Sequence, residues 1–185
     1  MPRPFKMLFF FLAGSIAFAA TYDYRILSTF RAPTMEKEMN EAAEQGFVFA
    51  DVMSGETPSR RDEVVVVMQK DTSAPSAQKR VYKLLTTARA STMEKEMQLL
   101  GENGFEYKAQ TEFKASTAGR EIAVIMERDR SIPVRKIEYK VLATVRMSTM
   151  EKELREAGDS GFRLAAMTSA RGFFSADEIC ILRKD

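Results

Sequence analysis

The chain has 185 residues, of which 45% are hydrophobic and 29% are charged, a balance typical of globular rather than disordered proteins. Its 28 basic and 26 acidic residues give a formal net charge of +2, and two of the basic residues, Arg3 and Lys6, lie at the very start. Because the remainder is close to neutral, we do not expect the strong basic field of a nucleic-acid-binding protein.

The chain begins with a basic segment, MPRPFK, and an apolar run over residues 7–20 follows it. A basic start, a short apolar run and a small-x-small pattern, here at residues 17–19, are typical of a secretory signal peptide. The run is shorter than the roughly 20 apolar residues that a membrane-spanning helix needs, so cleavage is favoured over retention as an anchor. The sequence therefore predicts a signal peptide over residues 1–19, and a periplasmic or secreted protein without a membrane span after cleavage.

A short phrase occurs three times, as PTMEKEM, STMEKEM and STMEKEL, and its copies begin 58 and then 57 residues apart. A Tyr-x-x-Leu segment precedes each copy, a Gly-Phe pair follows it, and an apolar run with a charged end comes last. Self-similarity at a fixed period is the signature of tandem structural units. The pattern predicts three repeats, at residues 22–71, 79–129 and 135–185, joined by polar linkers that contain proline.

Within each repeat the hydrophobic periodicity changes in a fixed order. Alternating residues such as Tyr24 and Ile26 predict a half-buried strand, and Met35 and Met39 of the phrase fall on one face of a helix. The glycine of Gly-Phe is the expected left-handed stop of this helix, and two more strands follow, the last of them apolar on both faces. Each repeat is therefore predicted to be an α+β unit, β-α-β-β, with a three-stranded sheet of order 1-3-2 and one helix on one face.

The repeated phrase is predicted to be mainly a helix start. Ser91 and Glu94 have the spacing of a capping box, as do Ser148 and Glu151, and Thr34 is the predicted cap of the first copy. The sequence leaves an alternative open, in which the exposed Glu and Lys side chains form three equivalent contact patches with an arginine just upstream. These arginines are Arg31, Arg89 and Arg146.

A unit of about 50–60 residues buries only about 60% of its unfolded surface, so the repeats are expected to share a core. We predict that they pack back to back, through the helix-free faces of their sheets. Alternation along the second strands makes this face apolar in the first and third repeats but polar in the second, which predicts the first and third as the packed pair. The residues assigned to this face are Val48, Ala50, Val52, Ala165 and Met167, against Glu106, Lys108 and Gln110 of the second repeat.

The segments Tyr139-Lys-Val-Leu, Gly161-Phe162 and the closing Ile-Leu-Arg-Lys resemble a family of small bacterial β-α-β-β domains of unknown function. That family has a Tyr-Lys-Val start, a Gly-Trp turn and a Leu-Lys-Arg end, and here Phe stands in place of the Trp. The order of elements is also similar to that of small periplasmic stress-associated domains and of dodecin, an oligomer that binds flavin. Dodecin's flavin-stacking Trp has no counterpart, because this chain has no Trp. The resemblance implies a fold and no reaction.

The residue types argue against catalysis. The chain has no His, which removes the commonest general base and the commonest metal ligand, and its glycines do not form a phosphate-binding loop. The methionines have the helical spacing of core residues rather than the convergence that Cu(I) ligation needs. The single Cys180 cannot form an intrachain disulfide and is expected to be a buried thiol. We therefore expect no enzyme, no cofactor and no metal site, with a hydrolase that uses carboxylates alone as the least favoured alternative.

The loops between the second and third strands of the repeats carry the candidate contact residues. Phe113 belongs to the second repeat, and Arg171, Phe173 and Phe174 belong to the third. Exposed aromatic side chains beside arginine are typical contact anchors. The alternative is that one Phe of the adjacent pair packs under the sheet and that the other is incidental.

The leading hypothesis is an exported, non-catalytic binding or interaction protein of the bacterial cell envelope, whose partner is another envelope protein or a small ligand. The alternative is a small-molecule carrier with a pocket between packed repeats, lined by Phe47, Phe49, Phe105 and Tyr107. The sequence names neither the ligand, the partner, the pathway nor the oligomeric state.

Overall fold

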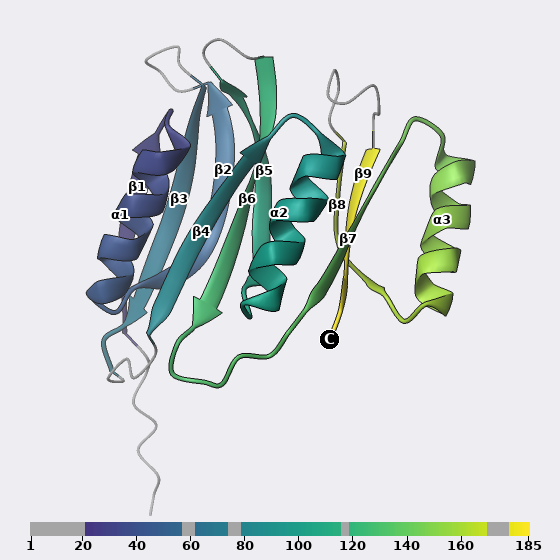
Figure 1. The fold of residues 1–185 in the computed structure, drawn as a ribbon. Coiled ribbons are helices and arrows are strands. Elements are labelled where there is room, and N and C mark those ends of the chain that lie inside the picture. The colour runs from purple at the N-terminus through teal and green to yellow at the C-terminus, as the bar shows by residue number, and fades with distance from the viewer. Residues whose placement is uncertain (1–20, 57–61, 74–78, 116–118, 170–177) are drawn as a thin grey trace, which may run out of the picture.

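The computed structural model describes residues 21–56, 62–73, 79–115, 119–169 and 178–185, which form three successive repeats (Figure 1). Repeat 1 consists of β1 (Tyr22–Thr29), α1 (Ala32–Glu44), β2 (Val48–Glu56) and β3 (Asp62–Asp71). Repeat 2 consists of β4 (Arg80–Thr87), α2 (Ala90–Glu102), β5 (Glu106–Ala115) and β6 (Gly119–Asp129). Repeat 3 consists of β7 (Glu138–Thr144), α3 (Met147–Asp159), β8 (Arg163–Ser169) and β9 (Glu178–Lys184).

Each repeat has its own three-stranded sheet, with the last strand in the centre and antiparallel to both neighbours. The strand orders are β1-β3-β2, β4-β6-β5 and β7-β9-β8. The central strands are continuous apolar runs, which is typical of a strand with neighbours on both edges and cover on both faces. The predicted α+β fold, the β-α-β-β order and the sheet order 1-3-2 are therefore confirmed.

The helices end as predicted but begin differently. The glycines after them have positive φ angles of 88°, 77° and 87°, the left-handed conformation that stops a helix, and they are Gly46, Gly104 and Gly161. The predicted capping boxes are wrong, because no side chain caps any of the three helices. The residues at the N-cap positions are Arg31, Arg89 and Arg146.

A β-bulge interrupts the second strand of every repeat. The register jumps from Phe49 to Asp51 in β2, and equivalent jumps pass over Lys108 in β5 and Ala165 in β8. One extra residue reverses the face on which all later side chains of the strand lie. Val52, Gln110 and Met167 therefore lie on the same face as the helix, opposite the position that simple alternation predicts for them.

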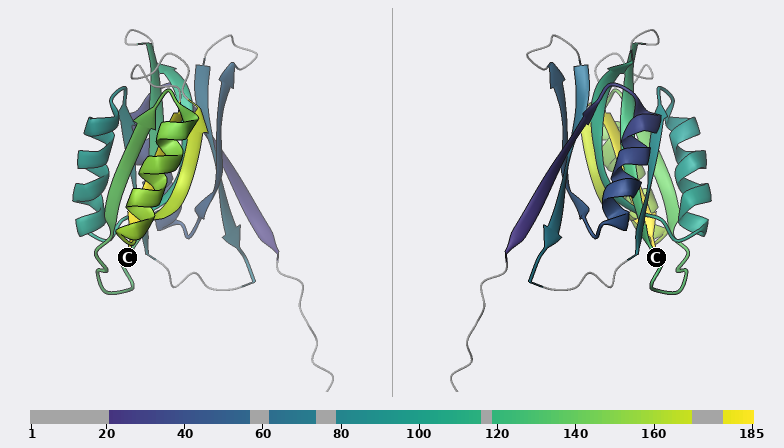
Figure 2. Two further views of the ribbon diagram at one scale, coloured as in Figure 1. Left: turned by 90° about the vertical axis from the view of Figure 1, so that its right-hand side faces the viewer. Right: turned by 90° about the vertical axis from the view of Figure 1, so that its left-hand side faces the viewer.

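The repeats stack front to back. We call the face of a sheet that its own helix covers the helix side, and the other face the open side. One core cluster joins Met39 and Met68, from the helix side of repeat 1, with Tyr82 and Ile125 from the open side of repeat 2. Repeats 2 and 3 are joined in the same way by a second cluster. The stack therefore runs in one direction, from β1 at one end to α3 at the other (Figures 1 and 2).

This arrangement corrects the prediction of back-to-back packing. The open sides of repeats 2 and 3 do carry the contacts between repeats, but each of them packs on the helix side of the preceding repeat. The predicted pairing of the first and third repeats is wrong, since no core cluster of the described residues joins them. The physical reason is that α1 and α2 each contact the first strand of their own repeat and the first strand of the next, so that one helix serves two sheets.

Two further expectations concern single segments of the chain. Cys180 is fully buried in the sheet of repeat 3, as expected, and burial raises the pKa of its thiol. The predicted signal peptide at residues 1–19 lies outside the described residues. Within the described part of the chain, none of the helices has both the length and the apolar character needed to cross a membrane.

Candidate functional site

The candidate contact residues are spread over the molecule. Arg31, Arg89 and Arg146 are exposed, and each lies at the start of the helix of a different repeat. Phe113 lies in strand β5, opposite Glu121 of β6, and not in a loop as predicted. The remaining candidates, Arg171, Phe173 and Phe174, lie outside the described residues. The described candidates therefore do not come together in one site.

A tyrosine in the first strand anchors repeats 2 and 3 to the repeat before them. Tyr82 is fully buried and Tyr139 is 4% exposed, and both side chains enter the core clusters between repeats. The Tyr82 hydroxyl accepts the N–H of Phe49 at 2.8 Å, and the Tyr139 hydroxyl accepts the N–H of Tyr107 at 2.8 Å. Phe49 and Tyr107 directly precede the β-bulge, where the ladder is interrupted. The bulge of one repeat thus supplies a hydrogen-bond donor to the tyrosine of the next.

The tyrosines at the contacts between repeats resist ionisation. Burial raises the pKa of Tyr139 to about 12 and that of Tyr107 to about 12 as well. Burial is also the main cause that raises the pKa of Tyr82, and the neighbouring Glu127 carboxylate adds to it. A neutral phenol can both donate and accept a hydrogen bond, as the Tyr139 hydroxyl does when it donates to the Phe105 carbonyl oxygen at 3.2 Å.

The first glutamate of the repeated phrase binds the edge of the following sheet. Glu36 Oε2 accepts the N–H of Leu84 at 3.0 Å, and Glu94 Oε2 accepts the N–H of Val141 at 2.8 Å. Edge strands present N–H groups that lack a strand partner, and here a carboxylate from the neighbouring helix takes that place. The phrase therefore has a contact role, but in these two copies the contact lies inside the chain.

An amide side chain, one helical turn later, extends this edge contact. Asn40 Oδ1 accepts the N–H of Tyr82 at 3.0 Å, and Asn40 Nδ2 donates to the Tyr82 carbonyl at 3.0 Å. In the next repeat Gln98 Oε1 accepts the N–H of Tyr139 at 2.9 Å. The helix thus presents a Glu and an Asn or Gln, spaced i and i+4, to alternate residues of the docked strand.

A glycine near the end of α2 brings repeat 3 especially close. A Cβ atom at Gly101 would lie 2.2 Å from the Ile137 carbonyl oxygen, and the Gly101 carbonyl accepts the Ile137 N–H at 3.0 Å. Repeat 1 has Ala43 at the equivalent position, and there a groove of about 980 Å³ separates the two repeats. Four cationic side chains are among those that line this groove: Lys70, Lys79, Arg80 and Arg130.

Apolar side chains are exposed at both ends of the stack. On the open side of repeat 1, Tyr24 is 60% exposed and Ile26 is 70% exposed, and Tyr22 and Met53 are exposed beside them. On the helix side of repeat 3, Leu164 is 52% exposed. Exposed apolar rows of this kind mark contact surfaces in soluble proteins.

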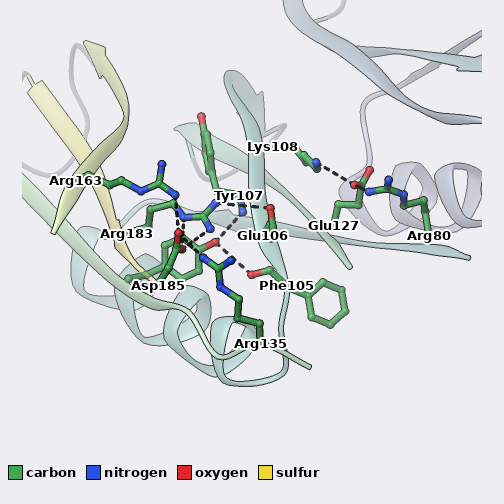
Figure 3. A network of polar contacts seen from close by, with 11 residues as sticks. Arg80, Phe105, Glu106, Tyr107, Lys108, Glu127, Arg135, Arg163, Arg183 and Asp185 are labelled. Atoms are coloured by element: carbon green, nitrogen blue, oxygen red, sulfur yellow. Dashed lines mark hydrogen bonds and ion pairs between the residues drawn. The ribbon is translucent and has the colours of Figure 1, made fainter. Parts of the chain in front are cut away.

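Charged side chains between these ends are paired with each other (Figure 3). The buried Glu127 accepts a hydrogen bond from the Tyr82 hydroxyl at 2.7 Å, pairs with Lys108 at 3.0 Å and also pairs with Arg80. A buried carboxylate needs such partners, because an unpaired charge in the interior is costly. This cluster therefore has the character of a structural ion-pair network.

A second charged cluster gathers around Asp185 (Figure 3). Its carboxylate pairs with Arg135 at 2.5 Å and with Arg163 at 2.7 Å, and it also bonds to Arg183. Burial acts to raise the pKa of Asp185, but the hydrogen bonds from Arg183 and Arg163 outweigh it and lower the pKa. Three cationic side chains keep this carboxyl group ionised, so it is not suited to transferring protons. It instead holds β8, β9 and the segment before β7 together.

The aromatic residues proposed to line a carrier pocket are packed instead. Phe47 and Phe105 are buried in the two core clusters between repeats, and Phe49 and Tyr107 pack against them. None of the four lines the groove beside Ala43. Among the residues that the structure describes, no group of three or more His, Cys, Asp or Glu side chains is placed to hold a metal ion.

Sequence reasoning missed the anchoring tyrosines and the partners of Glu36 and Glu94. A signal for the tyrosines was present, since Tyr24, Tyr82 and Tyr139 recur at the repeat period, each at the start of a Tyr-x-x-Leu segment. The glutamates carried a misleading signal, because the capping-box spacing is local whereas their partners lie 48 and 47 residues further along the chain.

Comparisons with protein-family models, with curated proteins and with solved structures found no match to this chain. The resemblance to small bacterial domains of unknown function therefore rests on the short motifs alone. Function has to be argued from the faces of the stack.

Proposed function

We propose that this protein is an exported, non-catalytic interaction protein of the bacterial cell envelope, and that it binds its partner through the ends of the repeat stack. The observation that carries the proposal is the exposed row of Tyr22, Tyr24 and Ile26 on β1. The same strand position is a docking surface in repeats 2 and 3, where Tyr82 and Tyr139 are buried against the preceding repeat. A face built for docking, with exposed aromatic and aliphatic side chains, suits a protein partner.

The charged clusters support a binding role over a catalytic one. Glu127 and Asp185 are both engaged by cationic side chains. A general acid or base needs a pKa near the working pH, whereas the pKa of Asp185 is lowered. Export is supported by the basic and apolar pattern of residues 1–19.

The proposal is tested by photo-cross-linking in the cells that produce the protein. A photoreactive phenylalanine analogue replaces Tyr24 in one variant and the exposed Lys37 of α1 in a control variant. We expect a cross-linked product of defined mass from position 24 and none from position 37. Equal labelling at both positions, or none at either, contradicts the proposal. Mass spectrometry of the isolated chain tests export, since cleavage after Ala19 leaves Ala20 as the first residue.

The alternative, a carrier of a small ligand, is favoured by one observation, the groove of about 980 Å³ between repeats 1 and 2. The groove is lined by four cationic and two acidic side chains, and one of the cations, Arg80, is already paired with Glu127. The other three cations would suit an anionic ligand, in a groove unlike the aromatic-lined pocket that the sequence predicted. Native mass spectrometry of the freshly isolated protein distinguishes the two functions. A carrier keeps additional small-molecule mass that Lys79→Glu removes, whereas an interaction protein shows the mass of the chain alone.

A further inference from the structure

The chain contains the same interface twice. In both copies a Glu of the helix accepts an N–H of the next repeat's first strand, at 3.0 Å from Leu84 and 2.8 Å from Val141. In both copies the tyrosine two residues earlier in that strand accepts the N–H of the residue before the β-bulge. An interface that one sequence builds twice, with the same contacts, defines a docking geometry that does not depend on the exact side chains around it.

Each end of the stack carries one half of this interface. The strand half is on β1, where Tyr24 and Ile26 stand at the positions of Tyr82 and Leu84. The helix half is on repeat 3, where Glu151 stands at the position of Glu94. Both halves are exposed: Tyr24 and Ile26 lie on the outer edge strand, and the Glu151 side chain is 66% exposed.

The surface around the helix half has the same components as the internal interfaces. Leu164 lies before the bulge of β8, at the position of Phe49 and Tyr107, and it is exposed where they are partly buried. Met167, after the bulge, lies at the position of Val52 and is exposed as well. The bulge itself is also retained, although among the described residues no following repeat covers it.

Gly158 gives independent evidence for an occupant. It occupies the position of Gly101, where a Cβ atom would clash with the docked strand, yet a Cβ at Gly158 would meet no described atom within 4 Å. Glycine in a helix lowers its stability relative to alanine. A glycine that the fold of this chain does not require is accounted for by a strand that docks as closely as the segment before β7 docks on Gly101.

We propose that copies of this chain associate head to tail, with β1 of one copy docking between α3 and β8 of the next. This inference rests on the proposed function and names a second copy as the partner. Tyr24 takes the place of Tyr139, its hydroxyl accepting the N–H of Leu164, and Glu151 accepts the N–H of Ile26. The contact is heterologous, so a pair of copies keeps one free half at each end, and further copies either extend it into an open chain or close it into a ring.

The side chains at the two ends differ from those of the first internal interface at two positions. Lys83 of β4 pairs with Glu36 at 2.6 Å, and Arg25 of β1 stands at the position of Lys83. Within its own chain Arg25 donates to Gln45 Oε1 at 2.7 Å and lies over the Phe47 ring, so it has to leave these contacts to pair with Glu151 between copies. The second difference is Arg155, which replaces Asn40 and Gln98 and pairs with Glu151 at 2.5 Å within α3. Docking has to displace this exposed pair, so the association is weaker than the internal contacts and depends on concentration.

The experiment measures the mass of the full chain, as isolated from cells, by analytical ultracentrifugation over a broad concentration series. Two variants each remove one half of the interface: Tyr24→Ala the strand half, and Gly158→Arg the helix half. Each is expected to lower the association constant by roughly tenfold or more. Lys152→Ala, on the exposed surface of α3, is the matched control and leaves association unchanged. Circular dichroism confirms that each variant is folded.

Mixing the two variants identifies the head-to-tail geometry. Tyr24→Ala keeps an intact helix half and Gly158→Arg keeps an intact strand half, so the mixture forms dimers that neither variant forms alone. Arg155→Gln gives position 155 the same residue as the equivalent Gln98 of repeat 2, and it is expected to strengthen association severalfold.

Three results overturn the inference. If two β1 edges pair symmetrically instead, Gly158→Arg associates as strongly as the wild type. If residues 1–19 of the same chain cover β1 instead, the isolated protein is a monomer that retains those residues. A wild-type chain that stays monomeric after they are removed also contradicts self-association. The proposed function is decided separately, because a cross-link from position 24 to a different envelope protein supports that function and excludes a second copy as the partner.

Discussion

The first strands of repeats 1 and 2 have similar sequences and opposite surroundings. Tyr24-Arg-Ile-Leu in β1 and Tyr82-Lys-Leu-Leu in β4 occupy the same place in the same fold. Yet Tyr24 is 60% exposed, whereas Tyr82 is fully buried and bonded through its hydroxyl to Phe49 and Glu127. The difference comes from the neighbour: α1 and the helix side of repeat 1 cover β4, and no described residue does the same for β1.

This comparison shows that alternation in a strand reports which face is apolar, but not whether the face is covered. In a directional stack each interface needs a strand half and a helix half, and the two ends each retain one. The apolar character of β1 is therefore a property of the repeat, and its exposure is a property of its position in the stack. Substitutions at equivalent positions should differ in effect according to that position.

The largest difference is expected between the buried and the exposed tyrosine. Tyr82→Ala and Tyr139→Ala each remove a buried ring and leave the N–H of Phe49 or Tyr107 without its acceptor, so each should lower the free energy of unfolding by about 3–5 kcal/mol. Tyr24→Ala should change it by no more than about 0.5 kcal/mol in dilute solution. Urea denaturation of the three variants measures this, and a loss at Tyr24 as large as at Tyr82 would refute the comparison.

The tyrosines at the contact between repeats 2 and 3 should also make stability sensitive to alkaline pH. The pKa of Tyr139 and that of Tyr107 are raised to about 12 in the folded protein, against about 10 in the unfolded chain. The folded state keeps protons that the unfolded state loses, so stability is complete below about pH 10 and falls as the pH rises towards 12. Each tyrosine contributes a slope of about 1.4 kcal/mol per pH unit. Urea midpoints measured across this range should fall less steeply in Tyr139→Phe, and an unchanged slope in that variant would contradict the assignment.

The two equivalent helix glycines should respond to alanine with opposite signs. At Gly101 the new methyl group meets the Ile137 carbonyl oxygen, which is backbone and cannot rotate away, so Gly101→Ala should lower the free energy of unfolding by about 1–3 kcal/mol. At Gly158 the methyl group meets no described atom. Because alanine has the higher helix propensity, Gly158→Ala should raise the free energy of unfolding by up to about 1 kcal/mol. Thermal denaturation in dilute solution tests both, and destabilisation by Gly158→Ala would show that its surroundings differ from those described.

The parts of this fold that depend on residues close together in the sequence could be predicted. The glycine stops of the helices and the apolar central strands are encoded within a few residues, and both were predicted correctly. The bulges were missed because the extra residues, Ala50, Lys108 and Ala165, share no residue type that marks them. Each missed bulge reversed the face assigned to the rest of its strand.

The stacking direction could not be predicted because it depends on contacts between distant residues. A pattern within one repeat shows that a helix has an apolar face, but not that this face serves two sheets. The candidate site was predicted from loop residues, and Arg171, Phe173 and Phe174 stay a prediction. The docking role of the repeated phrase became visible only when Glu94 was placed against Val141 of the next repeat.

The smallest difference is expected between the glutamates of the second and third phrases. Glu94→Ala removes the acceptor of the Val141 N–H, an edge group that the helix shields from water, and should lower the free energy of unfolding by about 1–2 kcal/mol. Glu151→Ala removes only the exposed pair with Arg155 on the same helix, worth about 0.3–0.5 kcal/mol. Glu94→Gln is the matched control, because its amide oxygen can still accept the bond, and it should recover most of the loss. If Glu94→Ala and Glu151→Ala proved equal in urea denaturation, the edge contact would contribute nothing beyond a surface ion pair, and the phrase would be conserved between the repeats for another reason.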